Sequence, residues 1–487
     1  MRYFLDPFGC VKNQVDAENM MAHLNSAGWE SAPEAESADL IIVNSCGFIE
    51  SAKQESINAV LGWRKLYPGK KILLAGCLAQ RYAKELAESL PEADALFGNT
   101  DLAGITGAAS RIAGSLVKRA ARKAADTVAD DAATVDSSEN SGQRPLLSLP
   151  GSAYVKISEG CDNRCAFCAI PLIRGGLQSR AIADILEECR GLLARGVREL
   201  CIIGQDIGSF GTDYSKADYS KADYSKADYS KADYSKADDP GAASMLPELL
   251  KAIATLDGRF WVRLLYIHPD RFPLQILDIM ERDARFLPYF DIPFQHASPK
   301  ILSAMNRHGT AETYLALLET IRRRLPRAVI RSTFLLGFPG ETDDDFAALL
   351  DFQEKAGADW LGCFTWSREE GTAAYSMKGR VSKKTAAERK RIVEERQIPI
   401  TEKNMDRFVG QILDVLIEEK FENSVDTDGI DADGETLWLG RVYCQAPDID
   451  GATVIVSDAA DGLRPGMLVP GKVIARRGFD LELTQPV

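Results

Sequence analysis

ISEGCDNRCAFC, at residues 157–168, places three cysteines on one short loop with the spacing C-x3-C-x2-C. The loop directly follows a predicted strand, AYVKISEG. Three thiolates at this spacing favour an iron–sulfur cluster or zinc, because soft sulfur ligands select these metals. A structural zinc site needs a fourth ligand, and none of the four histidines lies near the loop in the sequence. Three thiolates on a cubane cluster leave one iron open to a substrate or cofactor.

Strand and helix patterns alternate around this loop over residues 151–381. Helical patterns separate six strand candidates: AYVKISEG, ELCIIGQ, FWVRLLYI, YFDIPFQ, IRSTFLLG and DWLGCFTW. This alternation predicts a partial, six-stranded β/α barrel. A charged helix is expected at 382–402. Residues 403–487 then hold short β runs with regular turns, which predicts a small β-barrel.

The first 115 residues hold a second set of three cysteines. A β-α-β-α-β order there predicts a parallel α/β domain, followed by a polar, turn-rich linker at 116–150. Cys10, Cys46 and Cys77 each lie at the carboxyl end of one of the first three strands. Ligands of open α/β sheets bind outside these strand ends, so we expect the three thiols to converge. The alternative is three unrelated core cysteines.

Length and composition limit the class of protein. At 487 residues, 45% hydrophobic and 26% charged, the chain is long enough for about three globular domains. Ten cysteines are too sparse for a disulfide scaffold, and neither a signal peptide nor a membrane-spanning run is evident. We therefore expect a cytoplasmic protein without a membrane partner. The four cysteines outside the two triads lie in helix or strand patterns and are expected in the core: Cys189, Cys201, Cys363 and Cys444.

Negative charge is concentrated at the carboxyl end of the chain. The net charge is −13, and residues 403–487 hold eight lysines and arginines against sixteen aspartates and glutamates, a net of −8. Binding to RNA depends on neutralising phosphates, so an acidic barrel suits a basic protein partner better than transfer RNA. The alternative is an acidic surface without a partner.

One segment follows no structural period. Residues 213–237 repeat DYSKA five times, and a five-residue period keeps no apolar face in a helix or a strand. We interpret the repeat as a neutral, solvated loop insertion, which costs little because loop-closure entropy grows slowly with length. A role in contacting a partner is the alternative.

The loop at 157–168, with Phe167 before its last cysteine, resembles the radical S-adenosylmethionine (AdoMet) superfamily. In that superfamily the open iron chelates AdoMet, and reduction of the cluster cleaves AdoMet to a 5′-deoxyadenosyl radical. Together the two triads resemble the methylthiotransferase family, which joins an N-terminal domain with a second 4Fe–4S cluster to a radical AdoMet domain and a β-barrel called TRAM. Three segments carry this resemblance: FGCVKNQVDAE, VNSCGFIESAKQESI and ISEGCDNRCAFCAIPLIRGGLQSR.

The resemblance implies two sets of cluster ligands and several AdoMet contacts. Cys10, Cys46 and Cys77 would hold one 4Fe–4S cluster, and Cys161, Cys165 and Cys168 would hold the AdoMet-chelating one. The expected AdoMet-binding residues are Phe167, Gly204, Gln205, Asp206, Gly337 and Glu341. Residues 204–206 depart from the superfamily's Gly-Gly-Glu-like motif, and for them and for 337–341 a strand-end turn is the alternative.

Within the family, the ribosomal branch matches best, through LYIHPDRFP, PYFDIPFQHASPKILSAMNRHG and TFLLGFPGET. That branch adds a methylthio group to the β-carbon of one aspartate in small-subunit ribosomal protein S-twelve, with AdoMet, two clusters and an electron donor protein. The alternative is the transfer-RNA branch, which modifies isopentenyl-adenosine. A third possibility is a structural iron–sulfur or zinc protein that binds the ribosome without catalysis.

Overall fold

The computed structural model describes residues 1–117, 143–214, 243–421, 435–458 and 462–485. The chain divides into two compact units. The first unit comprises Met1–Leu147, Glu159–Gln178 and Ser367–Tyr375, and the second comprises Ser148–Ser158, Ser179–Trp366 and Ser376–Val487. Most of the predicted linker and almost all of the DYSKA repeat lie outside the described residues.

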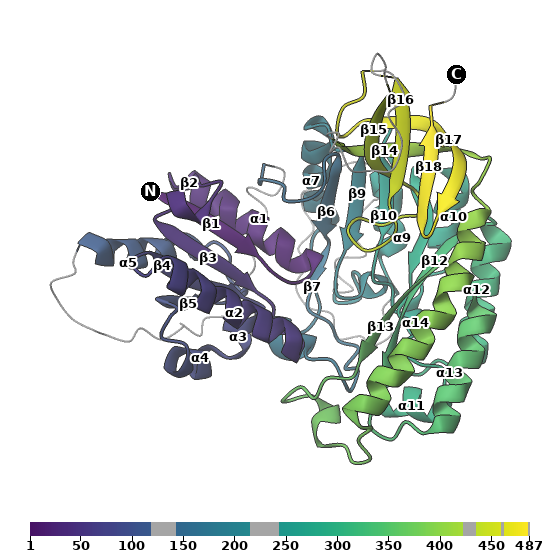
Figure 1. Cartoon of the computed structure of the whole chain (residues 1–487), viewed down its shortest axis with the longest axis horizontal. Coiled ribbons are helices and arrows are strands. Elements are labelled where there is room, and N and C mark those ends of the chain that lie inside the picture. Colours follow the sequence, from purple (N-terminus) through teal and green to yellow (C-terminus); the bar gives the residue numbers. More distant parts are fainter. Residues whose placement is uncertain (118–142, 215–242, 422–434, 459–461, 486–487) are drawn as a thin grey trace. The chain divides into compact units, whose positions relative to one another are not determined.

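The first unit is built on a five-stranded parallel sheet with the order β2-β1-β3-β4-β5 (Figure 1). Its strands are β1 (Arg2–Pro7), β2 (Glu30–Ser31), β3 (Leu40–Ser45), β4 (Lys71–Gly76) and β5 (Ala95–Phe97). Its helices are α1 (Val11–Ser26), η1 (Ala35–Ser37), α2 (Glu50–Leu66), α3 (Cys77–Arg81), α4 (Ala83–Ser89), α5 (Ile105–Val117) and α6 (Ile170–Arg174). The predicted parallel α/β domain is confirmed. The two edge strands β2 and β5 were not predicted, because two or three residues are too few to show a period.

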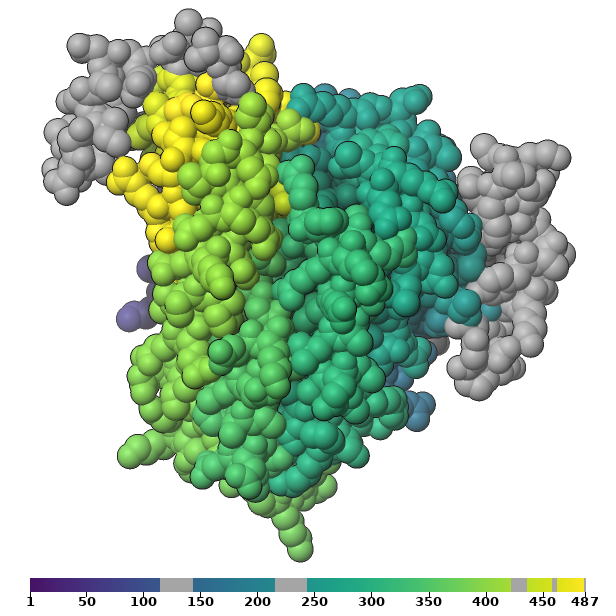
Figure 2. Space-filling model, turned by 90° about the vertical axis from the view of Figure 1, so that its right-hand side faces the viewer, coloured from purple at the N-terminus to yellow at the C-terminus, as the bar shows by residue number. Residues whose placement is uncertain are grey.

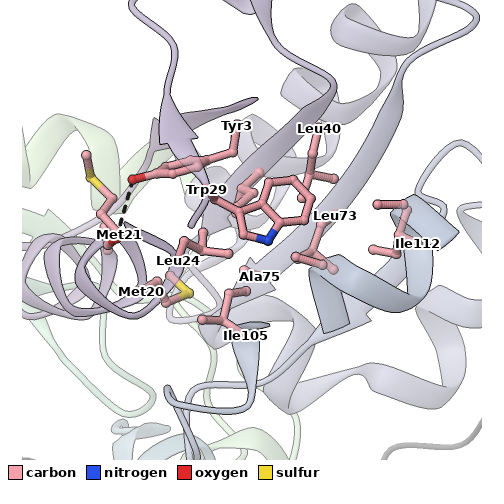
Figure 3. Packing of buried hydrophobic residues seen from close by; sticks show 14 residues of the cluster. Tyr3, Met20, Met21, Leu24, Trp29, Leu40, Leu73, Ala75, Ile105 and Ile112 are labelled. Atoms are coloured by element: carbon pink, nitrogen blue, oxygen red, sulfur yellow. Dashed lines mark hydrogen bonds between the residues drawn. The ribbon is translucent and has the colours of Figure 1, made fainter. Parts of the chain in front are cut away.

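Alternating strand residues build two cores in this unit, because successive side chains of a strand point to opposite faces of the sheet. Leu40 and Ile42 pack with Trp29 and with helices α1 and α5 (Figure 3). On the other face, Ile41 and Val43 pack with helices α2, α3 and α4. With both faces covered, functional side chains are left to the strand ends.

The second unit contains a six-stranded parallel sheet with the order β13-β12-β11-β10-β9-β6. Its strands are β6 (Ser152–Lys156), β9 (Glu199–Ile203), β10 (Trp261–Leu264), β11 (Phe286–Asp291), β12 (Val329–Leu336) and β13 (Trp360–Thr365). All six correspond to predicted strands. The remaining helices of this region are α7 (Ile182–Ala194), η2 (Ile207–Ser209), α9 (Leu246–Ala254), η3 (Pro269–Arg271), α10 (Ile276–Arg282), α11 (Pro299–Ala304), α12 (Ala311–Arg324) and α13 (Asp343–Ala356).

A long helix and a closed barrel complete the second unit. Helix α14 (Lys383–Asp406) packs on β12 and β13 and leads into a five-stranded barrel, as predicted. The barrel strands are β14 (Ile412–Lys420), β15 (Glu435–Val442), β16 (Thr453–Asp458), β17 (Leu468–Arg477) and β18 (Asp480–Thr484). Helices α12 to α14 and the barrel form one continuous face of this unit (Figure 2). Ion pairs from Arg476 to Glu402 and Asp406 join the barrel to the helix.

Three short elements lie where the chain passes between the units: β7 (Ser158–Glu159), β8 (Gln178–Ser179) and η4 (Ala373–Ser376). Among the described helices, none combines the length and the apolarity needed to cross a membrane. The cysteines outside the triads are buried, as expected for core residues: Cys189, Cys201, Cys363 and Cys444.

Candidate metal centre

The three N-terminal cysteines lie at the carboxyl ends of adjacent strands. Cys10 follows β1 and precedes α1, Cys46 directly follows β3, and Cys77 directly follows β4 as the first residue of α3. Strands β1, β3 and β4 are neighbours in the sheet, so the three chain segments leave the same edge side by side. Exposure falls along the series, since Cys10 is exposed, Cys46 half-buried and Cys77 buried.

Two glycines allow these segments to approach closely. A Cβ atom on Gly47 would lie 2.7 Å from the carbonyl oxygen of Cys77, which is too close for any other residue. A Cβ atom on Gly9 would lie 3.0 Å from Cβ of Cys46, and its φ of +97° is in the region that favours glycine. The glycines beside Cys10 and Cys46 therefore allow the three thiol-bearing segments to lie close together.

The thiols are close enough to influence one another's ionisation. Burial raises the pKa of Cys46, and the neighbouring Cys10 raises it further. Burial raises the pKa of Cys77 to about 12, while Arg174 opposes this shift and Asp16, Cys10 and Cys46 add to it. Metal binding requires thiolates, so a bound cation would have to displace these protons.

Cys161, Cys165 and Cys168 lie in the first unit too, on the loop between β7 and α6, and all three are half-buried. The ends of this loop are joined, because the amide of Cys161 donates to the carbonyl of Gly175 at 3.2 Å. A Cβ atom on Gly160 would collide with the carbonyl of Gly176, so the closure depends on glycine. The amide of Cys168 donates to the carbonyl of Cys165 at 3.0 Å, which turns the chain between these two cysteines.

A buried arginine joins the segments that carry the two triads. The Nη2 group of Arg174, at the end of α6, donates to Sγ of Cys77 at 3.2 Å, to Oδ1 of Asn13 at 3.1 Å and to Oδ2 of Asp16 at 2.9 Å. Its Nη1 group donates to Glu159 at 2.8 Å. Burial disfavours the charged guanidinium, but Asp16, Glu159 and the thiols hold the pKa of Arg174 well above its usual value.

The residues of both triads fit a thiolate-ligated iron–sulfur cluster in their chemistry. Each triad supplies three sulfur donors on closely packed segments, and N–H donors are directed at the sulfur of Cys77 from Arg174 and from Asn99, at 3.3 Å. No group of three His, Cys, Asp or Glu side chains among the described residues is already arranged to hold a metal ion.

The expected AdoMet-binding residues are divided between the units. Phe167 lies on the cysteine loop of the first unit, whereas Gly204, Gln205 and Asp206 follow β9 and Gly337 to Glu341 follow β12 in the second. Two of the carboxylates have local structural partners. Asp206 accepts from the amides of Gly208 and His268, at 3.0 and 3.1 Å.

Glu341 has a similar local role at the end of β12. It accepts from the amide of Gly337 at 2.6 Å and pairs with Arg389 at 2.6 Å. Burial raises the pKa of Glu341, while Arg389 and the backbone amides lower it. These contacts hold the loops after β9 and β12 in their conformations. The AdoMet-binding roles of the six residues stay predictions.

His296, which follows β11, is fully buried and its Nδ1 accepts from the amide of Ser298 at 3.0 Å, so it has a structural role.

Sequence reasoning missed Arg174, Asn13, Asp16 and Asn99. Asn13, Asp16 and Arg174 stand in the segments that carry the family resemblance, but no periodicity distinguishes a buried polar residue beside a thiol from an exposed one.

Three family models match the chain in succession. Residues 2–98 match uncharacterized protein family UPF0004, residues 155–352 match the radical SAM superfamily, and residues 409–484 match the TRAM domain. The chain is 44% identical to ribosomal protein uS12 methylthiotransferase RimO of Treponema denticola, over 98% of this chain and 99% of that protein. The chain belongs to the RimO methylthiotransferase family.

Other members of the family match at a similar extent. The protein of the same name from Syntrophomonas wolfei is 37% identical over 97% of each chain, and that from Aquifex aeolicus is 35% identical over 97% of this chain and 94% of that protein. Among solved structures, the radical S-adenosylmethionine methyltransferase TsrM of Kitasatospora setae is similar, with a TM-score of 0.51. At 16% identity over 77% of this chain and 75% of that chain, this likeness concerns the fold alone. The resemblance to methylthiotransferases and the predicted three-part architecture are thus confirmed.

Proposed function

We propose that this chain is a radical AdoMet methylthiotransferase that adds a methylthio group to the β-carbon of an aspartate in ribosomal protein uS12. Membership of the RimO family supports the reaction class and the substrate. The observation that carries the proposal is that both cysteine triads lie in one compact unit, connected by Arg174. A reaction that needs a radical and a sulfur at one carbon requires two metal sites near each other.

In this proposal Cys10, Cys46 and Cys77 hold one 4Fe–4S cluster, and Cys161, Cys165 and Cys168 hold the other. When bound, these groups supply reductive AdoMet cleavage and sulfur delivery. The chain's own residues position the groups: the close approach of Gly47 to Cys77 fixes one sulfur segment, and the closure at Gly160 fixes the other. Phe167, Gly204, Gln205, Asp206, Gly337 and Glu341 are the proposed AdoMet contacts.

The partners follow from the substrate. We place the reaction in the cytoplasm and expect an electron donor protein to reduce the cluster at Cys161, Cys165 and Cys168. The net charge of −8 on residues 403–487 favours the basic protein uS12 over transfer RNA. We assign the N-terminal cluster region to 1–115, the radical AdoMet region to 151–381 and the TRAM-like barrel to 403–487.

The test of the two metal sites is iron counting after anaerobic reconstitution. About eight irons per chain are expected for two 4Fe–4S clusters, and about four would contradict the assignment of one triad. Cys165→Ala should lose AdoMet cleavage to 5′-deoxyadenosine. Cys363→Ala, which removes a buried thiol outside both triads, is the matched control.

The test of the substrate is mass spectrometry of uS12 from cells that lack this gene. The methylthio mass on the aspartate should disappear and return with the intact gene. Its persistence in the deletion strain would refute the substrate. Nucleoside analysis of the same strain separates the alternative, because loss of a methylthio-adenosine would indicate transfer-RNA modification.

A further inference from the structure

Helix α6 connects the two cysteine triads within the first unit. It begins two residues after Cys168 and ends at Arg174. Ala169 and Ile173 pack against Cys77 in a small apolar cluster, with Phe48 at its edge. The segment that directly follows one triad thus contacts a cysteine of the other.

The sulfur of Cys77 is surrounded by polar partners from three segments. Arg174 and Asn99 direct N–H groups at it, at 3.2 and 3.3 Å. The thiol itself donates to Oδ1 of Asn13 at 3.2 Å, and the amide nitrogen of Asn13 donates to the carbonyls of Phe8 and Ser45. The position of this sulfur is therefore set by the surrounding chain.

Arg174 contributes a charge as well as a hydrogen bond. Its side chain is 2% exposed, and that of its partner Asp16 is 1% exposed. A buried ion pair costs desolvation, and well-packed apolar residues often replace such a pair without loss of stability. Stability alone therefore does not account for an arginine at this position, whereas a sulfur that gains negative charge does.

We propose that Arg174 is a positioning residue for the N-terminal cluster, which holds the Cys77 thiolate in place and raises the reduction potential of that cluster. This inference rests on the proposed role of Cys10, Cys46 and Cys77 as ligands. An electron added to a cluster spreads onto its sulfur ligands, so a nearby positive charge and an N–H···S bond favour the reduced form. Asp16, whose carboxylate pairs with Arg174 at 2.9 Å, has the opposite effect, because a nearby negative charge disfavours the reduced form.

The experiment uses the full chain with Cys161, Cys165 and Cys168 replaced by alanine, so that any remaining cluster belongs to the N-terminal triad. Iron counting comes first, and about four irons per chain are expected. A parent protein without iron would overturn the ligand assignment and this inference with it. A redox titration followed by electron paramagnetic resonance then gives the potential of the remaining cluster.

The variants of this parent differ in the sign of the expected shift. Arg174→Gln should lower the ratio of reduced to oxidised cluster at a fixed potential by about tenfold, which is about 59 mV for a one-electron couple. Arg174→Lys keeps the charge and should shift the ratio less. Asp16→Asn should shift it in the opposite direction.

Arg144→Gln is the matched control. It also breaks a fully buried pair in the first unit, with Glu18, but no hydrogen bond connects Arg144 to a cysteine among the contacts of the described residues. Its potential should equal that of the parent. The inference is overturned if Arg174→Gln retains four irons at the parent potential, or if Asp16→Asn and Arg174→Gln shift the potential in the same direction. If Arg174→Gln does not fold, the sign of the shifts in Arg174→Lys and Asp16→Asn decides.

Discussion

Each unit of the molecule contains a buried arginine network, and the two networks use their arginines differently. In the second unit, Glu199 forms ion pairs with Arg263 at 2.7 Å and with Arg441 at 2.6 Å. These pairs join β9 and β10 of the sheet to β15 of the barrel. In the first unit, Arg174 also pairs with the carboxylates of Asp16 and Glu159, but its Nη2 group donates in addition to the sulfur of Cys77. Charged donors that end on carboxylates hold elements together, whereas a charged donor that ends on a thiol adjusts the chemistry of that thiol.

The ionisation of Glu199 supports a structural role for the second network. Burial alone would raise the pKa of Glu199, but Arg441 and Arg263 lower it to about 2. Its Oε2 atom also accepts from the Ser152 hydroxyl at 2.8 Å. The carboxylate stays charged at any physiological pH, so the ion pairs of this network persist when the pH changes.

The largest expected effect comes from breaking this structural network. Glu199→Gln removes the carboxylate that pairs with Arg263 and one of the two that pair with Arg441, the other being Glu418. It should lower the free energy of unfolding by about 3–5 kcal/mol, because buried charge is left uncompensated. Chemical denaturation measures the loss. Glu187→Gln, which removes an exposed pair with Arg190, is the control and should cost less than about 1 kcal/mol. A loss below about 1 kcal/mol for Glu199→Gln would contradict the structural role of the Glu199 network, which is what distinguishes it from the network around Cys77.

The second prediction concerns pH and the second unit. Burial lowers the pKa of His296 to about 4, so the folded state keeps it neutral while the unfolded chain binds a proton below pH 6.5. Stability is therefore lost as the pH falls below 6.5, by about 2 kcal/mol at pH 5 from this residue. His296→Asn should remove that part of the slope. The measurement is the difference in unfolding free energy between the parent and the variant at pH 7 and pH 5, and an unchanged difference would contradict the prediction.

The third prediction tests the tight approach in the first unit. Gly47→Ala would place a Cβ atom 2.7 Å from the carbonyl of Cys77, so the two segments must separate, at a cost of about 1–3 kcal/mol. Iron bound by the N-terminal triad should fall with it. Gly62→Ala in α2 is the control, because nothing lies within 4 Å of its added Cβ and alanine should stabilise this helix by about 0.5–1 kcal/mol. Full iron content in Gly47→Ala would show that the close approach is dispensable.

The sequence predicted the strands well, and with them the position of the N-terminal cysteines at strand ends, because both depend on local patterns. Apolar runs such as LIIVNS at β3 show a buried strand directly, and Cys46 follows it in the chain. The networks were not predictable in the same way. Glu199 and Arg441 lie 242 residues apart, and only the packing of the barrel on the sheet brings them together.

Arg174 illustrates the same limit at the candidate metal centre. Its distance in sequence from Cys77 is 97 residues, and an arginine six positions after a cysteine loop is ordinarily solvent-exposed. The sequence supplies the thiols, while the surroundings that adjust them depend on tertiary structure. Residues 204–206, which depart from the superfamily motif, show the same limit. Asp206 accepts hydrogen bonds from the backbone amides of Gly208 and His268, and the second of these contacts depends on tertiary structure.

The smallest expected effect separates charge from hydrogen bonding at one sulfur. Asn99 also donates a hydrogen bond to the sulfur of Cys77, as Arg174 does, but the amide of Asn99 is neutral. Neutral hydrogen bonds contribute about 1 kcal/mol and those of charged groups about 1.5–3 kcal/mol. In the protein that retains only the N-terminal triad, Asn99→Ala should therefore shift the reduced-to-oxidised ratio in the direction of Arg174→Gln, by less than about fivefold. Asn99→Asp replaces the donor by a negatively charged side chain of the same size and should shift the ratio further in the same direction. A shift in Asn99→Ala that equals that of Arg174→Gln would mean that hydrogen bonding, rather than the charge of the arginine, distinguishes the network around Cys77 from the one around Glu199.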